Sequence, residues 1–230
     1  MESIATTLME ELECETVFTI PIFGGIPIAE SVVVTWIIMA VLVVLSIFLT
    51  RNLKVENASK RQLVVEYCVT WLQNLVKGMV GEEGIRYVPY LVTVIVYIGF
   101  ANIIGLFGMK SPTKDLNVTV ALSVMSIVLI EYAGIHAKGV KGWLKSFAEP
   151  VPVILPINIL EIFIRPLSLC MRLFGNVLGA FVVMELLKCL CALILPIPFS
   201  LYFDIFDGLI QAYVFVFLTS LFIKEAAETT

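Results

Sequence analysis

Long apolar runs separated by short polar segments dominate this chain and predict helices that cross a membrane. About 20 consecutive apolar residues span a bilayer as an α-helix. The fourth run is about twice as long as one perpendicular span needs, so it is either two spans or one heavily tilted helix. No turn-forming cluster interrupts its centre, which favours the tilted helix. We therefore predict five spans, over residues 31–50, 87–107, 116–135, 152–195 and 199–223.

The segment between the first two spans has a different pattern. Over residues 60–80, apolar side chains such as Leu63, Tyr67 and Trp71 recur at helical spacing, opposite polar ones such as Glu66. This pattern predicts an amphipathic helix that lies in the membrane interface. Residues 1–30 and 224–230 then flank a single membrane domain. The expected fold is an all-α integral membrane protein.

Composition agrees with this fold and excludes several classes of function. The chain is 60% hydrophobic and only 15% charged, with a net charge of -4. Soluble domains are about 45–50% apolar, and nucleic-acid binders need a basic surface that is missing here. One histidine, His136, and five cysteines without a Cys-x-x-Cys pair give no pattern for a metal or cofactor site. We expect neither a metal nor a cofactor.

The positive charges in the loops predict how the chain is oriented. Only Lys110 and Lys114 lie between spans two and three, whereas the neighbouring connections are rich in lysine and arginine. Because cytoplasmic loops carry the excess of positive charge, the N-terminus is predicted outside and the C-terminus in the cytoplasm. The basic residues of the two cytoplasmic connections are Arg51, Lys54, Lys60, Arg61, Lys77, Arg86, Lys138, Lys141 and Lys145.

Polar residues persist on one face of the long fourth segment. They are spaced 4, 3, 4, 4 and 3 residues apart, which is one helix face: Glu161, Arg165, Ser168, Arg172, Asn176 and Gly179. An arginine at the bilayer centre costs ~2.5–3.5 kcal/mol on insertion scales. Arg172 lies too far from either end to reach the interface, so it must face water or a carboxylate. Glu161 and Arg165 also have the i,i+4 spacing of a structural ion pair.

The last segment has a matching polar face. Asp204, Gln211 and Thr219 recur at helical spacing, with Asp207 beside them. Two polar-faced helices predict an ion path between or beside them. By helix geometry Gln211 lies roughly 10 Å along the axis from Asp204, a plausible route for a cation. The serines and Glu131 of the third span are interpreted as structural, since hydroxyls in membrane helices often bond their own backbone.

Three sequence motifs resemble those of subunit a of the rotary F-type ATP synthases. Arg165-Pro-Leu-Ser-Leu169, followed by Arg172-Leu-Phe-Gly-Asn176, is similar to that family's Pro-x-Ser-Leu-x-x-Arg-Leu-Phe-Gly-Asn signature. Gly208-Leu-Ile-Gln-Ala-Tyr-Val-Phe215 resembles its Gln-Ala-x-x-Phe segment, and Asp115-Leu-Asn-Val-Thr119 resembles its Asp-x-Asn-x-Thr sequence. The motifs occur in the family's order and extend from about Asn102 to the end of the chain.

The resemblance implies the stator of an ion motor in a bacterial plasma membrane. Such a subunit lies beside a ring of c subunits and delivers H+ or Na+ to the ring carboxylates through two offset half-channels. The tilted fourth helix and the last helix would form the hairpin that carries this path. The essential arginine of the family falls on Arg172, its polar neighbours on Ser168 and Asn176, its glutamine on Gln211, and an acidic or histidine position on Asp204.

The resemblance also implies partners: the c-ring, the b subunits of the peripheral stalk, the bilayer, and the F1 sector indirectly. The subunit itself would not be an enzyme, and whether the ion is H+ or Na+ stays open. Two positions that are often acidic in the family are Phe181 and Gly105 here. The alternative is a self-contained transporter or channel in which Arg172 binds an anionic substrate, although five spans without an internal repeat do not favour it.

Overall fold

The chain folds into long helices that pack side by side, as the sequence predicts. The computed structural model describes residues 16–20, 26–51, 53–54, 59–107, 109, 111–147, 155–190 and 196–227. Five helices in this part of the chain are long and apolar enough to cross a membrane, Glu30–Thr50, Gly84–Leu106, Leu116–Ser146, Leu155–Lys188 and Pro198–Ala227. The all-α membrane fold is thereby confirmed. The ends of the predicted fourth span, 152–154 and 191–195, lie outside the described residues.

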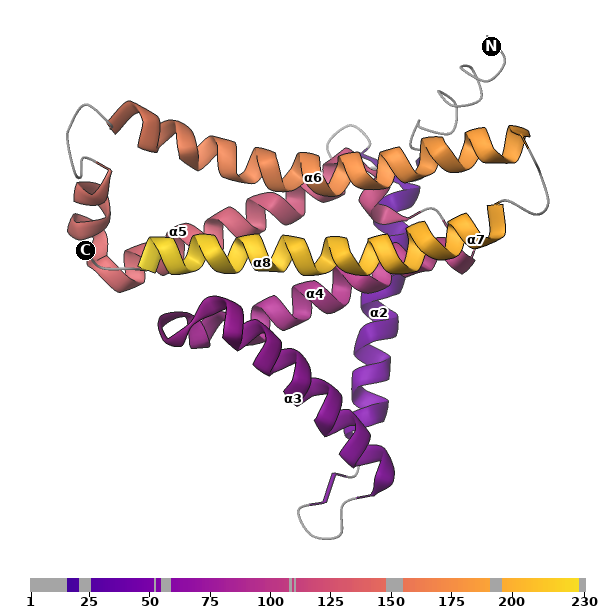
Figure 1. Ribbon diagram of the computed structural model, residues 1–230, viewed down its shortest axis with the longest axis horizontal. Coiled ribbons are helices and arrows are strands. Elements are labelled where there is room, and N and C mark those ends of the chain that lie inside the picture. Colours follow the sequence, from indigo (N-terminus) through magenta and orange to yellow (C-terminus); the bar gives the residue numbers. More distant parts are fainter. Residues whose placement is uncertain are drawn as a thin grey trace.

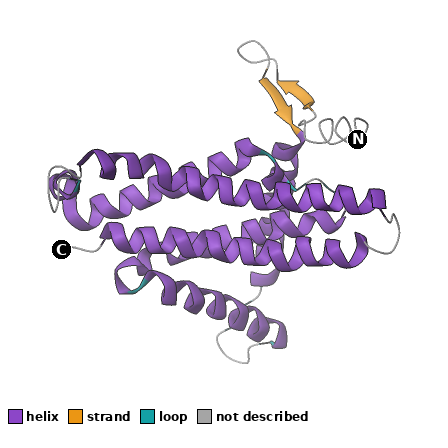
Figure 2. Ribbon diagram, turned by 45° about the horizontal axis from the view of Figure 1, so that its top comes forward, coloured by secondary structure: helices purple, strands orange, loops and turns teal. Residues whose placement is uncertain are grey.

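The helices follow one another with short irregular turns between them. The α-helices are α2 (Glu30–Thr50), α3 (Lys60–Val80), α4 (Val88–Ile103), α5 (Leu116–Ser146), α6 (Leu155–Leu190), α7 (Pro196–Ser200) and α8 (Gly208–Ala227). Three 3-10 turns, Glu82–Tyr87, Ile104–Phe107 and Pro112–Lys114, flank α4 and precede α5. A π-helical turn, Leu201–Asp207, joins α7 to α8. A short antiparallel ribbon of β1 (Thr16–Ile20) and β2 (Ile26–Ala29), which the sequence did not predict, precedes α2 (Figure 2).

Helices α4, α5, α6 and α8 form the body of the molecule, and α8 lies at its centre (Figure 1). α8 contacts α4, α5 and α3, whereas α6 packs mainly on α5. The shared core joins residues from α3, α4, α5, α6 and α8, among them Leu91, Ile130, Leu173 and Phe215, all with 1% exposure or less. The hairpin predicted for the fourth and last spans is present, with α6 and α8 running in opposite directions (Figure 1).

A glycine permits close approach of α4 and α8. A Cβ atom built on Gly208 would lie 2.7 Å from the Cβ of Asn102, which no packed pair of carbons allows. Small residues commonly let helix backbones approach in membrane proteins, since packing rather than the hydrophobic effect holds such helices together. Gly208 therefore sets how near the last helix comes to α4.

The lengths of the helices place limits on their tilt. α2 has 21 residues, about 32 Å, which matches one perpendicular crossing of a ~30 Å hydrocarbon core. α6 has 36 residues, about 54 Å, and needs a steep tilt to stay within the same core. α2 runs across the direction of the other long helices (Figure 1). Both lengths therefore fit one bilayer if α2 stands upright and the whole four-helix body is inclined.

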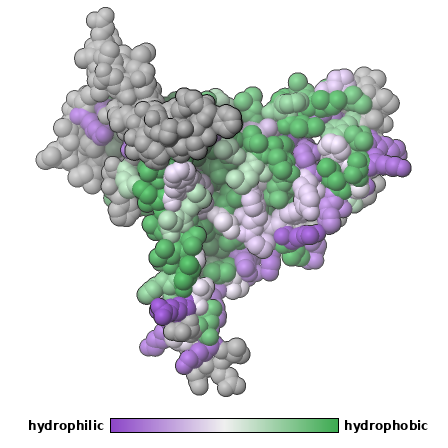
Figure 3. Space-filling model, turned by 180° about the vertical axis from the view of Figure 1, so that it is seen from behind, coloured by the Kyte–Doolittle hydropathy of each residue, from purple (hydrophilic) through white to green (hydrophobic). Residues whose placement is uncertain are grey.

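The amphipathic helix predicted over residues 60–80 is present as α3, and its interfacial position stays a prediction. Ser59 caps it by accepting a hydrogen bond from the backbone N–H of Gln62. Tyr67 and Trp71 are exposed while Val76 is buried in the shared core. Exposed apolar residues also cover α2, and the molecule seen from behind is hydrophobic along this arm and hydrophilic at its tip (Figure 3).

Two helices extend beyond the predicted spans. α5 continues to Ser146 through residues expected to form a polar connection, with a break at Gly139, where φ is 71° and ψ 161°. Trp143 Nε1 donates to Glu131 Oε2 across this break, at 2.8 Å. α8 continues to Ala227, so part of the expected tail is helical. Polar residues suggested loops at both places, but a helix outside the membrane tolerates lysine and glycine on its exposed face.

Candidate functional site

The polar stripe of α6 divides between two environments. At about 100° per residue, Arg165 and Asn176 lie only about 20° apart around the axis, and Ser168 lies about 60–80° from them. Going around the axis from Arg165 past Asn176, the next residues are the buried Leu169 and Leu173. One edge of the stripe therefore turns toward the neighbouring helices, and the other faces outward.

Arg172 lies on the outward part of the stripe and is exposed, as is Ser168. No hydrogen bond or ion pair joins Arg172 to any of the residues that the structure describes. Its neighbours along α6, Leu167 and Met171, are also exposed, at 60% and 52%. A guanidinium that is always protonated is thus presented on an otherwise apolar surface.

Arg165 has the opposite environment. Its side chain is 14% exposed, and its Nη2 donates to Glu161 Oε1 at 3.0 Å and to Glu225 Oε1 at 2.9 Å. Its guanidinium carbon also lies 5.0 Å from the centre of the Phe222 ring. The predicted i,i+4 ion pair is present, and Glu225 on α8 extends it. These residues line a cavity of about 180 Å³ at the end where α6 begins and α8 ends.

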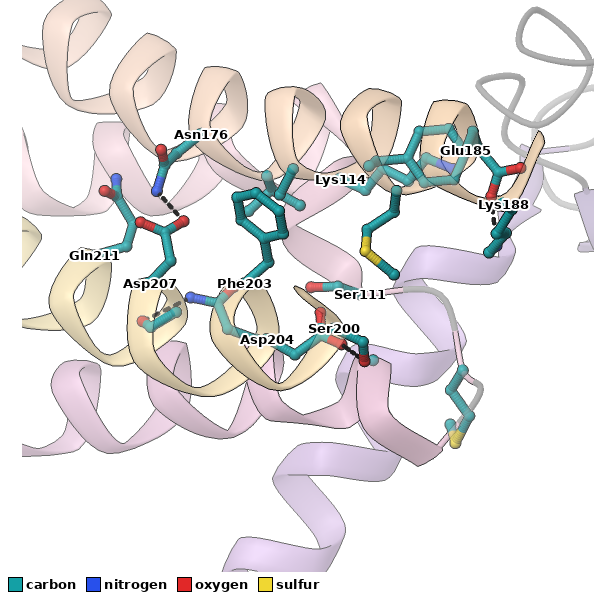
Figure 4. A pocket seen from close by; sticks show the side chains of 18 residues that line it. Ser111, Lys114, Asn176, Glu185, Lys188, Ser200, Phe203, Asp204, Asp207 and Gln211 are labelled. Atoms are coloured by element: carbon teal, nitrogen blue, oxygen red, sulfur yellow. Dashed lines mark hydrogen bonds and ion pairs between the residues drawn. The ribbon is translucent and has the colours of Figure 1, made fainter. Parts of the chain in front are cut away.

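Asn176 and Asp207 connect α6 to the start of α8. The Asn176 Nδ2 donates to Asp207 Oδ2 at 2.6 Å. Gln211, one turn further along, is 6% exposed, and its Nε2 is buried without a hydrogen-bond partner in the described part of the chain. All three side chains line a cavity of about 390 Å³ and lie close to one another (Figure 4). The structure therefore brings together the predicted amides and one of the predicted carboxylates.

Asp204 lies in the same cavity, on the side away from Asn176 (Figure 4). Its Oδ2 accepts a hydrogen bond from Ser200 Oγ at 3.0 Å. A Cβ atom on Gly105 would lie 3.1 Å from Asp204 Oδ1, so the carboxylate occupies the space beside this glycine. Asp204 and Asp207 belong to the π-helical turn, a geometry that is frequent at functional sites.

Asn102 has a structural place beside the cavity. Its Nδ2 donates to the carbonyl of Gly208 at 3.0 Å, and its Oδ1 accepts from Thr113 Oγ1 at 2.8 Å. It is 5% exposed, and both ends of its amide are used. Asn102 thus fastens α4 and the turn before α5 to the first residue of α8. The serines of α5, as expected, bond their own backbone: Ser123 Oγ donates to Val120 O and Ser126 Oγ to Leu122 O.

Three residues of these sites were not predicted. Lys114 places its Nζ 3.2 Å from the centre of the Phe181 ring within the larger cavity. Ser200 hydrogen-bonds Asp204, and Glu225 pairs with Arg165. Helical spacing could have found Ser200, four residues before Asp204, but Lys114 and Glu225 come from distant segments. Among the described residues, no group of three His, Cys, Asp or Glu side chains is arranged to hold a metal ion.

Residues 32–224 match the family model described as ATP synthase A chain. This chain belongs to that family. It is 38% identical over 204 residues to ATP synthase subunit a of Moorella thermoacetica, covering 88% of this chain and 92% of that protein. It is 35% identical to ATP synthase subunit a 2 of a Bradyrhizobium species, covering 88% and 91% of the two chains.

Membership of the ATP synthase A chain family confirms the resemblance drawn from the three motifs. The motifs extend only from about Asn102, whereas the family match begins at residue 32 and takes in α2 and α3 as well. The matched range contains both sides of the larger cavity and most of the smaller one. The protein is therefore a multi-pass membrane member of this family. The functions of individual site residues stay predictions.

Proposed function

We propose that this chain is the ion-translocating stator subunit a of a rotary F-type ATP synthase. It would lie beside the c-ring and pass H+ or Na+ to and from the ring carboxylates through two offset half-channels. The observation that carries this proposal is Arg172, exposed on the apolar face of α6 without a partner among the described residues. Family membership supports it.

The exposed position of Arg172 demands a counter-charge from outside the chain. An isolated arginine within a bilayer costs ~2.5–3.5 kcal/mol on insertion scales, and more in simulations. An ionised carboxylate of the c-ring faces the same cost in lipid. Placed opposite each other, the two charges remove most of that penalty. The exposed apolar residues around Arg172 would then meet the ring rather than lipid.

Arg172 would also couple ion flow to rotation. A ring carboxylate crosses the lipid face only when its charge is neutralised by the ion, and it loses the ion on reaching Arg172. The fixed positive charge repels a cation that would pass directly from one half-channel to the other. Each ion therefore has to ride the ring for nearly a full turn. The membrane potential contributes ~2.3 kcal/mol per charge for each 100 mV.

The larger cavity is suited to the outer half-channel. Asp204 is a carboxylate that can accept the cation, and Asp207 with Gln211 lies deeper along the same helix. Asn176, which holds Asp207, is only about 6 Å along α6 from Arg172 at ~1.5 Å per residue. The polar side chains thus form a series that ends beside the arginine. The smaller cavity, beside Arg165 and Glu161, has the place expected of the inner half-channel.

The surrounding assembly follows from this proposal. The N-terminus lies outside a bacterial plasma membrane and the C-terminus in the cytoplasm, in accord with the lysines of residues 138–145. The b subunits of a peripheral stalk would hold the chain against the turning ring, and the F1 sector would be reached only through them and the ring. ATP chemistry belongs to that sector, so this subunit is not itself an enzyme.

Arg172→Ala tests the proposed function. ATP-driven ion pumping by the assembled complex in inverted vesicles should be abolished, because the ring carboxylate loses its counter-charge. The variant should still insert and co-purify with the c subunits, since Arg172 has no described partner within the chain. Met125→Ala, a change at an exposed position on α5, is the matched control and should pump normally. Normal pumping by Arg172→Ala would falsify the assignment.

A further inference from the structure

The side chain of Arg165 joins α6 to α8. Its partner Glu161 is on the same helix, four residues earlier, and can only orient the guanidinium. Its partner Glu225 is on α8, and Phe222 on the same helix packs its ring against the guanidinium. The arginine is largely buried at 14% side-chain exposure, so its charge depends on these partners more than a surface charge would.

The contact between α6 and α8 is sparse elsewhere. α6 packs mainly on α5, and its outward residues, such as Leu167 and Met171, are exposed. Leu169 and Leu173 are the buried residues that α6 contributes to the shared apolar core. Hydrogen bonds and ion pairs between α6 and α8, which we call polar ties, therefore help to set the position of α6 relative to α8.

Two such ties bracket Arg172. The Asn176–Asp207 hydrogen bond lies on one side and the Arg165–Glu225 ion pair on the other. At ~1.5 Å per residue, Arg172 is about 6 Å along α6 from the first and about 10 Å from the second. A segment that is joined to α8 at both ends, with Leu169 and Leu173 packed in the core between them, presents the exposed side chain of Arg172 at a defined place. Without the ion pair, only packing on α5 and the apolar contacts of Leu169 and Leu173 would set where this end of α6 lies relative to α8.

We propose that Arg165 is a positioning residue, whose ion pair with Glu225 fastens α6 to the last turns of α8 and thereby holds Arg172 in place at the ring surface. This inference rests on the proposed function of Arg172. It assigns Arg165 and Glu225 no contact with the ion. Loss of the tie should loosen α6, so that ions leak past Arg172 and ATP hydrolysis is less completely coupled to pumping.

Glu225→Gln in the intact complex tests the proposal through two measurements. The first is pumping per ATP hydrolysed, which should fall several-fold while hydrolysis continues. The second is the distance between spin labels at Ile159 on α6 and Leu221 on α8, both exposed positions, in a background without the native cysteines. Double electron–electron resonance spectroscopy should show a broader distribution of distances between the two labels in the variant. Exchanging the charges, Arg165→Glu with Glu225→Arg, should restore both measurements.

Two matched variants separate the tie from simpler explanations. Glu161→Gln removes the other partner of Arg165 but leaves the bond to α8, so the label distance distribution should stay as narrow as in the parent protein. Glu131→Gln removes a negative charge from the same cavity without touching Arg165. If Glu131→Gln reproduces the defect, the charge of the cavity is responsible and the positioning role is overturned.

Other outcomes also overturn the inference, and they differ from failure of the proposed function. An unchanged distance distribution in Glu225→Gln, or a charge exchange that restores neither measurement, contradicts the tie. The proposed function fails only if Arg172→Ala pumps normally. The label distances report on the tie in either case, since they need no ion transport.

Discussion

Two arginines two turns apart on one helix have opposite environments. Arg165 is enclosed by two carboxylates and an aromatic ring, whereas Arg172 is exposed and has no partner among the described residues. Both belong to the same polar stripe, and an angular difference of about 20° separates them. The two positions differ in what lies opposite α6: the end of α8 lies beside Arg165, whereas no described residue pairs with Arg172. The same residue type is therefore structural at one position and available to an outside partner at the other.

The pair formed by Asp204 and Gly105 gives a prediction at the residue scale. Asp204→Ala should reduce ion pumping to below about a tenth, since the carboxylate proposed to take up the ion is lost. Adding Gly105→Asp should restore much of it, because a side chain at position 105 starts 3.1 Å from where the Asp204 carboxylate lies. ATP-driven pumping in inverted vesicles measures both effects.

The matched control for this rescue is Gly105→Ala in the same Asp204→Ala background. It fills part of the space but adds no carboxylate, so pumping should stay low. If Gly105→Asp restores no more pumping than Gly105→Ala, a carboxylate in the cavity is not required for ion transport.

At the scale of the element, α8 combines packing and polarity in one helix. Gln211, Phe215 and Thr219 lie on one face and are all buried, the first beside the larger cavity and the others within the bundle. The π-helical turn before it carries both carboxylates. The helix that forms the centre of the core is thus also the helix that supplies most of the candidate ion path.

The break in α5 gives a prediction at this scale. Gly139 has φ 71° and ψ 161°, a region that only glycine adopts readily. Gly139→Ala should cost about 1–3 kcal/mol and weaken the Trp143–Glu131 hydrogen bond that spans the break. Trp143 fluorescence, recorded with Trp36 and Trp71 replaced by phenylalanine, should shift to longer wavelength.

Val140→Ala is the control for this change, since Val140 is the next residue and is 61% exposed. It alters the side chain beside the break without constraining the backbone, so the Trp143 spectrum should not move. A Gly139→Ala protein with the parental spectrum and melting temperature would show that the break does not depend on glycine.

At the scale of the whole molecule, the lengths of α2 and α6 fit a single membrane if α2 stands upright and the four-helix body is inclined. The long helix α6 extends from one cavity, beside Arg165, to the other, beyond Asn176, with Arg172 between them, and α8 lines both cavities as well. The two cavities thus open at opposite ends of the body. Such a layout suits two half-channels that are offset from each other along the ring.

The predicted orientation is tested by labelling single cysteines in a background without the native ones. A cysteine at Lys188, near the end of α6, should react with an impermeant maleimide on intact cells. One at Lys141, in the last part of α5, should react only in inverted vesicles, because cytoplasmic segments carry the positive charge. A cysteine at Leu45, within α2, should react from neither side. Reversed labelling of Lys188 and Lys141 would contradict the orientation.

The sequence by itself determined the membrane class, the five long apolar helices, the amphipathic helix over residues 60–80 and the family. Each follows from local properties: the length of apolar runs, helical periodicity and contiguous motifs. The tilt of the long fourth helix stays a prediction, based on an apolar run about twice as long as one perpendicular span needs. The prominence of Arg172 came from the scarcity of charge around it.

Only the tertiary structure decided which neighbours the polar residues meet. The period of a helix shows which residues share a face, but not what lies opposite that face. Pairing of Arg165 with Glu225, 60 residues away, depends on how α6 and α8 cross, as does the contact of Asp204 with the space at Gly105. These relations arise from packing between distant segments, and no local pattern in the sequence contains them.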